Sequence, residues 1–162
     1  MSILLYSCFS APKTTHNFTY KNRQITMEGV GRYQVGPLPK EWKMEKSQGP
    51  SILFEHRKTG STITTQAFCN ELFEDLPLSV LTNHLFVGLE NVKRVSKEEW
   101  QLSQRDALYT KATADVDGVP VFLNIVIVKK NRCSFDFFNI QPQAERQDLT
   151  NDFLQFVKGF SY

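Results

Sequence analysis

The chain has 162 residues, close to the roughly 150 of one typical domain, which predicts a single folded unit with a substantial apolar core. With 41% hydrophobic and 22% charged residues, the composition excludes a disordered or low-complexity chain. The 19 Lys and Arg against 17 Asp and Glu give a net charge of +2, and no basic stripe accompanies it, so nucleic acid is not expected as a partner. No apolar run is long enough to cross a membrane as a helix, so we expect membrane contact only through a lipid anchor.

The first residues suggest such an anchor. Leu5-Tyr6-Ser7-Cys8 resembles the lipobox of bacterial lipoprotein signals, in which the cysteine receives lipid. Two features depart from that pattern: Tyr6 is bulky, and the apolar stretch is short with no basic residue before it. Either the true start lies upstream of Met1 or the likeness is chance. Because residues 10–17 are polar and typical of a tether, we interpret residues 1–17 as a truncated signal or lipobox with a tether, and residues 18–162 as one domain.

Short strands are predicted in the first half of the domain. A short extended piece, residues 32–35, lies between glycine-rich and proline-rich turns, and Trp42 is expected to plug one end of the core. The β-rich runs 51–56 and 62–68 flank a polar loop that contains Gly60, which predicts a hairpin.

A helix is predicted over residues 78–89. Leu78, Leu81, Leu85 and Leu89 repeat at spacings of three and four, as on one face of a helix. Asp75-Leu76-Pro77 supplies a cap acceptor and a proline for the first turn. The acidic residues Glu71, Glu74 and Asp75 would favour the positive end of the helix dipole.

The second half predicts a four-stranded antiparallel meander followed by a helix. Strands are expected over 92–95, 107–114, 119–128 and 133–140, with hairpin turns at Asp117-Gly118 and Lys130-Asn131. The strand 119–128 is apolar on both faces and must be covered on both. A helix over 145–158 carries an aromatic stripe and ends at Lys158-Gly159. The expected fold is therefore α+β, an antiparallel β-sheet with helices packed on both faces.

Cys69 and Cys133 each lie on a predicted strand, on the face turned toward an apolar layer. One interpretation is two buried free thiols, because cysteine packs as a small hydrophobe. The other is a disulfide closing a loop of about 64 residues, which is worth roughly 4 kcal/mol in the chain-entropy model. The cysteines lack the paired spacing of a zinc site, so neither a metal nor another cofactor is expected.

Five motifs together resemble a known group of proteins. They are Ala67-Phe68-Cys69, Asp75-Leu76-Pro77-Leu78, Asp117-Gly118-Val119-Pro120-Val121, Cys133-Ser134-Phe135-Asp136 and Phe153-Leu154-Gln155-Phe156-Val157-Lys158-Gly159-Phe160. Over residues 33–160 the sequence resembles the PsbP-like and DcrB-like fold group, named for an extrinsic photosystem II subunit, and within it uncharacterised bacterial lipoproteins. The resemblance implies a PsbP-like α/β/α sandwich and a cell-envelope location, but no reaction.

No catalytic site is predicted. His16, His56 and His84 lack metal-ligand spacing, and nucleophile-elbow, Walker and dinucleotide motifs are absent from the sequence. Asp136 is expected either on a solvated face paired with Lys or Arg, or in a buried pocket. Trp100 and Arg105 flank a turn, where they would pack structurally or form a ligand edge.

Two functions remain open. The first is a non-enzymatic envelope lipoprotein, anchored through Cys8, that binds a protein or a small hydrophobic ligand between its sheet and a helix. The second is a soluble cytosolic adaptor of the same fold, with Cys69 and Cys133 reduced. An enzyme with a reactive cysteine is disfavoured, because neither internal cysteine has a His or Lys neighbour in sequence to lower its pKa.

Overall fold

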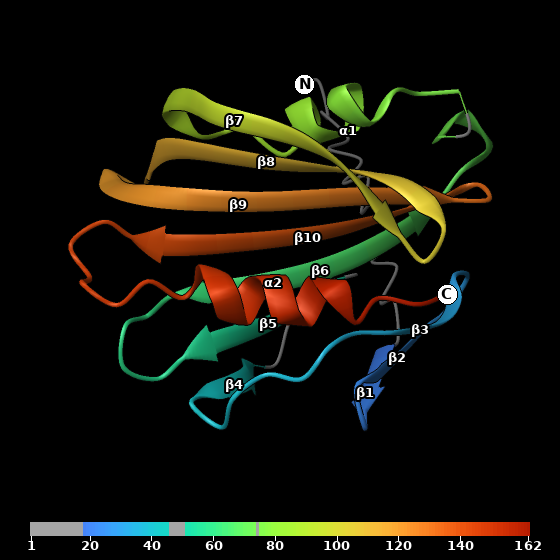
Figure 1. Ribbon diagram of the computed structural model, residues 1–162, viewed down its shortest axis with the longest axis horizontal. Helices are drawn as coiled ribbons and strands as arrows, with labels where there is room; N and C mark the ends of the chain where they lie inside the picture. Colours follow the sequence, from blue (N-terminus) through green and yellow to red (C-terminus); the bar gives the residue numbers. More distant parts are fainter. Residues whose placement is uncertain (1–17, 46–50, 74) are drawn as a thin grey trace, which may run out of the picture.

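The computed structural model describes residues 18–45, 51–73 and 75–162 (Figure 1). One antiparallel sheet has the strand order β4-β5-β6-β10-β9-β8-β7. Its strands are β4 (Trp42–Glu45), β5 (Ser51–His56), β6 (Thr62–Cys69), β7 (Glu90–Leu102), β8 (Arg105–Val116), β9 (Val119–Lys130) and β10 (Cys133–Pro142). A second sheet has the order β1 (Phe18–Lys21), β2 (Gln24–Met27) and β3 (Gly31–Gln34). The helices are the 3-10 turn η1 (Glu71–Phe73), α1 (Leu78–His84) and α2 (Thr150–Lys158).

The fold is mainly β, so the predicted α+β class with helices packed on both faces is wrong. α1 has seven residues and α2 has nine, whereas β7 to β10 have between 10 and 13. On the face that carries α2, here called the α2 face, that helix shares one apolar core with residues of the small sheet, such as Ile25 and Tyr33. On the opposite face, here called the α1 face, α1 contacts β8 and β9. The apolar pattern of β9 required cover on both sides, and the short helices α1 and α2 both contact β9 without forming helical layers over the sheet.

The predicted antiparallel meander is confirmed. β9 lies between β8 and β10, and residues 123–128 are all buried. Asp117 and Gly118 adopt φ values of 49° and 79°, the left-handed pair that a tight hairpin turn requires. β7 is longer than the predicted 92–95 and reaches Leu102, where Ser103 and Gln104 make a similar turn into β8.

Both helices are shorter than predicted. α1 ends at His84 rather than continuing to Leu89, and its N-cap is Pro77 with no side-chain hydrogen bond, so Asp75 does not cap it. α2 begins at Thr150 rather than at Glu145. The leucine spacing after His84 instead serves a turn, whose Gly88 has φ 87°.

The predicted Cys69–Cys133 disulfide is present. The two cysteines lie directly opposite each other at one end of the β6–β10 ladder, with Cα atoms 4.0 Å apart and sulfurs 2.00 Å apart. Cys133 is buried, whereas Cys69 is exposed. Within this sheet, β6–β10 is the pairing that joins strands distant in sequence, so the disulfide ties the β4–β5–β6 half to the β7–β10 half.

Gly159 has a different role from the one its position predicts. Its φ is −80°, so it does not adopt the left-handed conformation of a helix C-cap glycine. A Cβ on Gly159 would lie 2.3 Å from the Cα of Gly36, and a Cβ on Gly36 would lie 1.9 Å from the backbone oxygen of Gln155. The Gly36 amide donates to the Phe156 carbonyl at 2.7 Å. Two glycines therefore allow the segment after β3 to pass against the end of α2.

Candidate binding groove

A groove of about 460 Å³ opens on the α2 face, between β7 to β9 and the segment that leads into α2. Val95 and Phe122 line it and are 68% and 49% exposed. Phe122 lies on β9 directly opposite Thr113 of β8 and Gln141 of β10, both of which also line the groove. The groove therefore presents two large apolar side chains to solvent.

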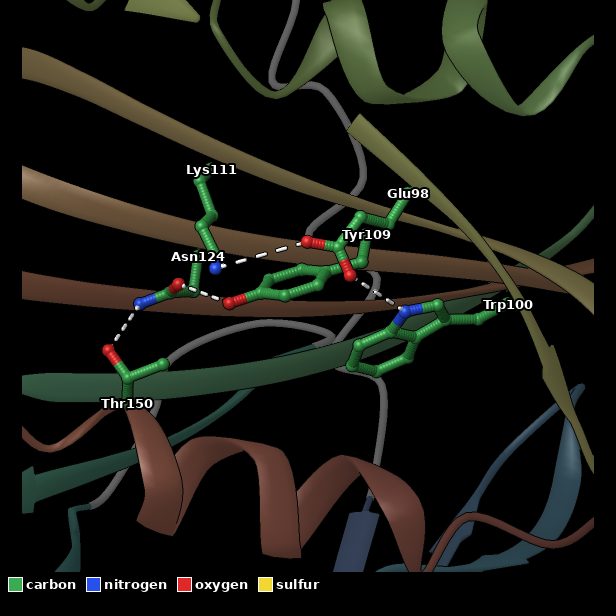
Figure 2. A network of polar contacts seen from close by, with 6 residues as sticks. All are labelled: Glu98, Trp100, Tyr109, Lys111, Asn124 and Thr150. Carbon is green, nitrogen blue, oxygen red and sulfur yellow. Dashed lines mark hydrogen bonds and ion pairs between the residues drawn. The ribbon is translucent and has the colours of Figure 1, made fainter. Parts of the chain in front are cut away.

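A network of hydrogen-bonded side chains, which includes the groove residues Asn124, Gln141 and Thr150, forms the floor of this groove (Figure 2). The Tyr109 hydroxyl donates to the Asn124 side-chain oxygen at 2.7 Å. The Asn124 amide nitrogen donates to Asn139 at 3.0 Å and to the Thr150 hydroxyl at 3.3 Å. Asn124 and Asn139 are 4% and 0% exposed, so both side-chain amides are buried. Buried polar groups whose hydrogen bonds are all satisfied hold their side chains in a single conformation.

Gln141 connects the same network to the start of α2. Its amide nitrogen donates to Asn139 at 2.8 Å and to Thr150 at 3.1 Å, while its oxygen accepts the Leu149 backbone amide at 2.8 Å. The Thr150 amide donates to the Asp148 carboxylate at 2.9 Å. These bonds hold the groove wall against the sheet and explain why α2 starts at Thr150.

Charged and aromatic side chains continue from the network along β7 and β8. Glu98 accepts from the Trp100 indole at 3.3 Å and pairs with Lys111 at 3.9 Å, and Figure 2 shows both contacts beside the Tyr109 ring. The Trp100 and Tyr109 rings lie 4.6 Å apart, and the Lys158 ammonium lies 5.9 Å from the Trp100 ring.

Two groups at this site have shifted pKa values. Burial, reinforced by the Glu98 and Asp148 carboxylates, raises the pKa of Tyr109 to about 12. Hydrogen bonds from Thr150 lower the pKa of Asp148. At neutral pH, Tyr109 is therefore a hydrogen-bond donor and Asp148 a carboxylate.

A larger hollow of about 740 Å³ lies between the start of α1 and the β7–β8 hairpin. Much of its lining is charged or polar, including Lys97, Glu99, Gln101 and Asp106. None of the large apolar side chains with high exposure in the described residues lines it. The smaller groove beside Phe122 is therefore the better candidate for binding.

The structure separates most of the residues singled out from sequence. Cys8 and His16 lie outside the described residues. Trp100 packs on the Tyr109 ring and beside the Lys158 ammonium, which agrees with the structural-packing alternative for this residue. His56 is buried in the β5–β6 hairpin, where it hydrogen-bonds Thr59 at 3.0 Å.

Within residues 18–45, 51–73 and 75–162, no cluster of three or more His, Cys, Asp and Glu side chains is placed to hold a metal ion. In the same part of the chain, no helix has the length and apolar character needed to cross a membrane.

Asp136 occupies a buried position, one of the two predicted alternatives. It is 8% exposed and lines a pocket of about 280 Å³ on the α1 face. Burial raises its pKa, and hydrogen bonds from Ser134 and Gln66 counteract part of that effect. The alternative of a solvated carboxylate paired with Lys or Arg is wrong.

The groove itself was not predicted from sequence. Phe122 belongs to the apolar run of β9, and this run predicts a buried strand along its whole length. It is half exposed because α2 begins at Thr150 and leaves this end of β9 uncovered. A partial signal is present in the polar residues Asn124 and Gln141, which interrupt otherwise apolar strands near this end.

No protein-family model matches the chain, and no curated protein matches its sequence. Solved structures do share its fold. LpqN, described as involved in cell envelope biogenesis of Mycobacterium tuberculosis, matches with a TM-score of 0.58 at 12% identity, over 83% of this chain and 86% of LpqN. Cyanobacterial PsbP (CyanoP) from Synechocystis sp. PCC 6803 matches with a TM-score of 0.53 at 9% identity, over 97% and 98% of the two chains.

A third solved structure is longer than this chain. It comes from Bacteroides thetaiotaomicron and matches with a TM-score of 0.57 at 14% identity. The match covers 80% of this chain but only 44% of the other. At such identities the likeness shows the fold alone: this chain has a PsbP-like fold, as its resemblance implied.

Proposed function

We propose that this chain is a non-enzymatic binding module of the cell envelope, and that it binds a partner protein at the groove beside Phe122. The observation that carries the proposal is the exposure of Val95 and Phe122, 68% and 49%, over a floor fixed by buried hydrogen bonds. Large apolar side chains that are exposed within one groove are typical of binding sites.

The openness of the groove favours a protein over a small hydrophobic ligand. Small-molecule sites enclose about 70–90% of their ligand, and wall residues as exposed as Val95 do not achieve that. Protein interfaces instead combine an apolar centre with a polar rim. Glu145, Arg146 and Lys111 line the same groove and supply such a rim with charges of both signs.

Two observations support a location outside the cytoplasm. The Cys69–Cys133 disulfide is of a kind that persists in oxidising compartments, because cytosolic thiols are kept reduced. The PsbP-like fold is shared with LpqN, whose description places it in cell envelope biogenesis. The alternative is a cytosolic adaptor of the same fold, which would carry both cysteines as thiols.

A lipid on Cys8 is the finer part of this proposal. Its support is the Leu5-Tyr6-Ser7-Cys8 sequence and the polar tether that follows. The gene with its upstream region, expressed in its host and labelled with a palmitate analogue, should give labelled protein that loses the label in Cys8→Ala. Equal labelling of both proteins, or of neither, would reject the anchor.

Photocrosslinking tests the groove. A photoreactive amino acid replaces Phe122 in the host cell, and the control carries it at Val87, which is 83% exposed in the turn after α1. We expect a discrete protein adduct from position 122 that is absent from position 87 and is competed by excess wild-type protein but not by Phe122→Ser. Identical adducts at both positions, no adduct, or an adduct with the mass of a small molecule would contradict a protein-binding groove.

A further inference from the structure

Asp136 is buried on the α1 face of the sheet, opposite to the groove. It lies on β10 between Gln66 of β6 and Ile127 of β9. Its two carboxylate oxygens each accept one hydrogen bond, from the Ser134 hydroxyl at 2.6 Å and from the Gln66 amide at 3.2 Å. Both donors are neutral. A carboxylate offers about four acceptor positions, so two positions are left for a further donor.

The charges around Asp136 leave its carboxylate without an ion pair in the described part of the chain. The ion pairs there are Lys43–Glu45, Lys111–Glu98 and Arg132–Glu71. Lys129 of β9 lies on the same face, and its ammonium donates to the Leu76 carbonyl at 2.5 Å. Burying a charge without a partner of opposite sign is costly, and a cationic ligand would remove that cost.

The pocket beside Asp136 has a lining suited to such a ligand. Its volume is about 280 Å³, and its walls are Thr64, Gln66, Leu85, Asp136, Phe138 and Ile140. Asp136 is the one charged residue in this lining, and three of the others are apolar. At about 30 Å³ for each water in the liquid, the space holds a short alkyl chain with a polar head.

We propose that this pocket binds a primary ammonium group on a short apolar chain, with the ammonium at Asp136 and the chain against Leu85, Phe138 and Ile140. An ammonium has three donors, which the Asp136 carboxylate, the Gln66 side-chain oxygen and the Thr64 hydroxyl would accept. The ligand is either a free alkylamine or the lysine side chain of another protein. Because the pocket lies on the other face of the sheet, this inference does not depend on the groove.

Binding is measured by NMR on the whole chain, through the Asp136 side-chain carboxyl ¹³C signal. The probes are n-pentylammonium, the neutral 1-pentanol of similar shape, and Nα-acetyl-lysine methylamide. The last compound carries a free side-chain ammonium on a peptide unit. The titration is run at about pH 8, well above the ordinary carboxyl pKa, because burial raises the pKa of Asp136. We expect n-pentylammonium to shift the signal and to bind at least about tenfold more tightly than 1-pentanol.

The lysine probe separates the two sources. Binding of both amines indicates a site open to a protein lysine, and binding of n-pentylammonium alone indicates a free small amine. Equal binding of amine and alcohol, or no change in the Asp136 signal with either amine, would overturn the proposal.

Two variants provide the matched comparison. Asp136→Asn removes the charge inside the pocket, whereas Glu55→Gln removes an exposed charge from the same face of the sheet on β5. Loss of amine binding of about tenfold or more in Asp136→Asn, with wild-type binding in Glu55→Gln, is the expected result. Equal affinity in both variants would contradict the proposal. Should Asp136→Asn fail to fold, the carboxyl signal of the wild-type protein still decides.

Discussion

Replacing Cys69 and Cys133 with alanine removes the covalent link between the two halves of the large sheet. The residues are 64 positions apart, and they join β6 to β10 at one end of their ladder. In the chain-entropy model, a loop of this length restricts the unfolded chain by about 4 kcal/mol at 25 °C. For a domain of this size, that loss corresponds to a fall in Tm of roughly 8–16 °C.

Urea denaturation of oxidised wild type and of the double variant measures this difference, with the same pair in reductant as the control. We expect reductant to lower the midpoint of the wild type toward that of the double variant and to leave the variant unchanged. Cys69 is exposed but Cys133 is buried, so the reductant control is what separates loss of the bond from loss of packing at Cys133. Equal midpoints for oxidised wild type and double variant would refute the reasoning, as would a wild type insensitive to reductant.

Three further predictions concern the core, the buried carboxyl and the network. Gly36→Ala should destabilise the fold by about 2 kcal/mol or more, because the new Cβ meets α2 backbone at 1.9 Å; Gly60→Ala, in open space at φ 67°, should cost about 1 kcal/mol in urea denaturation. Burial raises the pKa of Asp136 in the folded protein above its ordinary value of 3.8. The folded state therefore loses stability as pH rises from 3.8 through this raised pKa, because the unfolded chain releases its proton first. Asp136→Asn should therefore gain stability relative to wild type as pH rises, with no gain below about pH 3; an advantage that shrinks with rising pH would contradict this. Tyr109→Phe should cost about 1–2 kcal/mol by leaving Asn124 without its 2.7 Å donor, and ultraviolet titration should place the Tyr109 pKa at about 12, with a value near 10 excluding its burial.

Local signals in the sequence predict the strands and hairpins well. Asp117-Gly118 specifies a turn through residues that tolerate positive φ, and the structure has that turn between β8 and β9. The β5–β6 hairpin around Gly60 follows from the same kind of signal. The β6–β10 pairing joins segments distant in sequence, and no strand pattern predicted it; a disulfide between Cys69 and Cys133 was one of two interpretations, and it is the one that brings these segments close.

Features set by tertiary packing were not predictable. The apolar pattern of β9 showed that both of its faces needed cover, but it did not show that this cover would be two short helices rather than full helical layers. The leucine spacing predicted a helix that continues past His84, where α1 ends, because a turn and a helix can share the same periodicity over a few residues. The late start of α2 depends on the hydrogen bond from the Leu149 amide to the Gln141 side chain. Sequence periodicity does not reveal this bond, so it could not predict that Phe122 is exposed.

The central claim, that this chain is a binding module of the cell envelope, is tested most directly by the state of its cysteines in the native cell. Free thiols are alkylated at lysis, the cells are fractionated, and non-reducing mass spectrometry follows the peptides that contain Cys69 and Cys133. We expect a disulfide-linked peptide pair in the envelope fraction. Recovery of the protein from the cytosol with both residues alkylated would contradict the envelope location and favour the cytosolic adaptor.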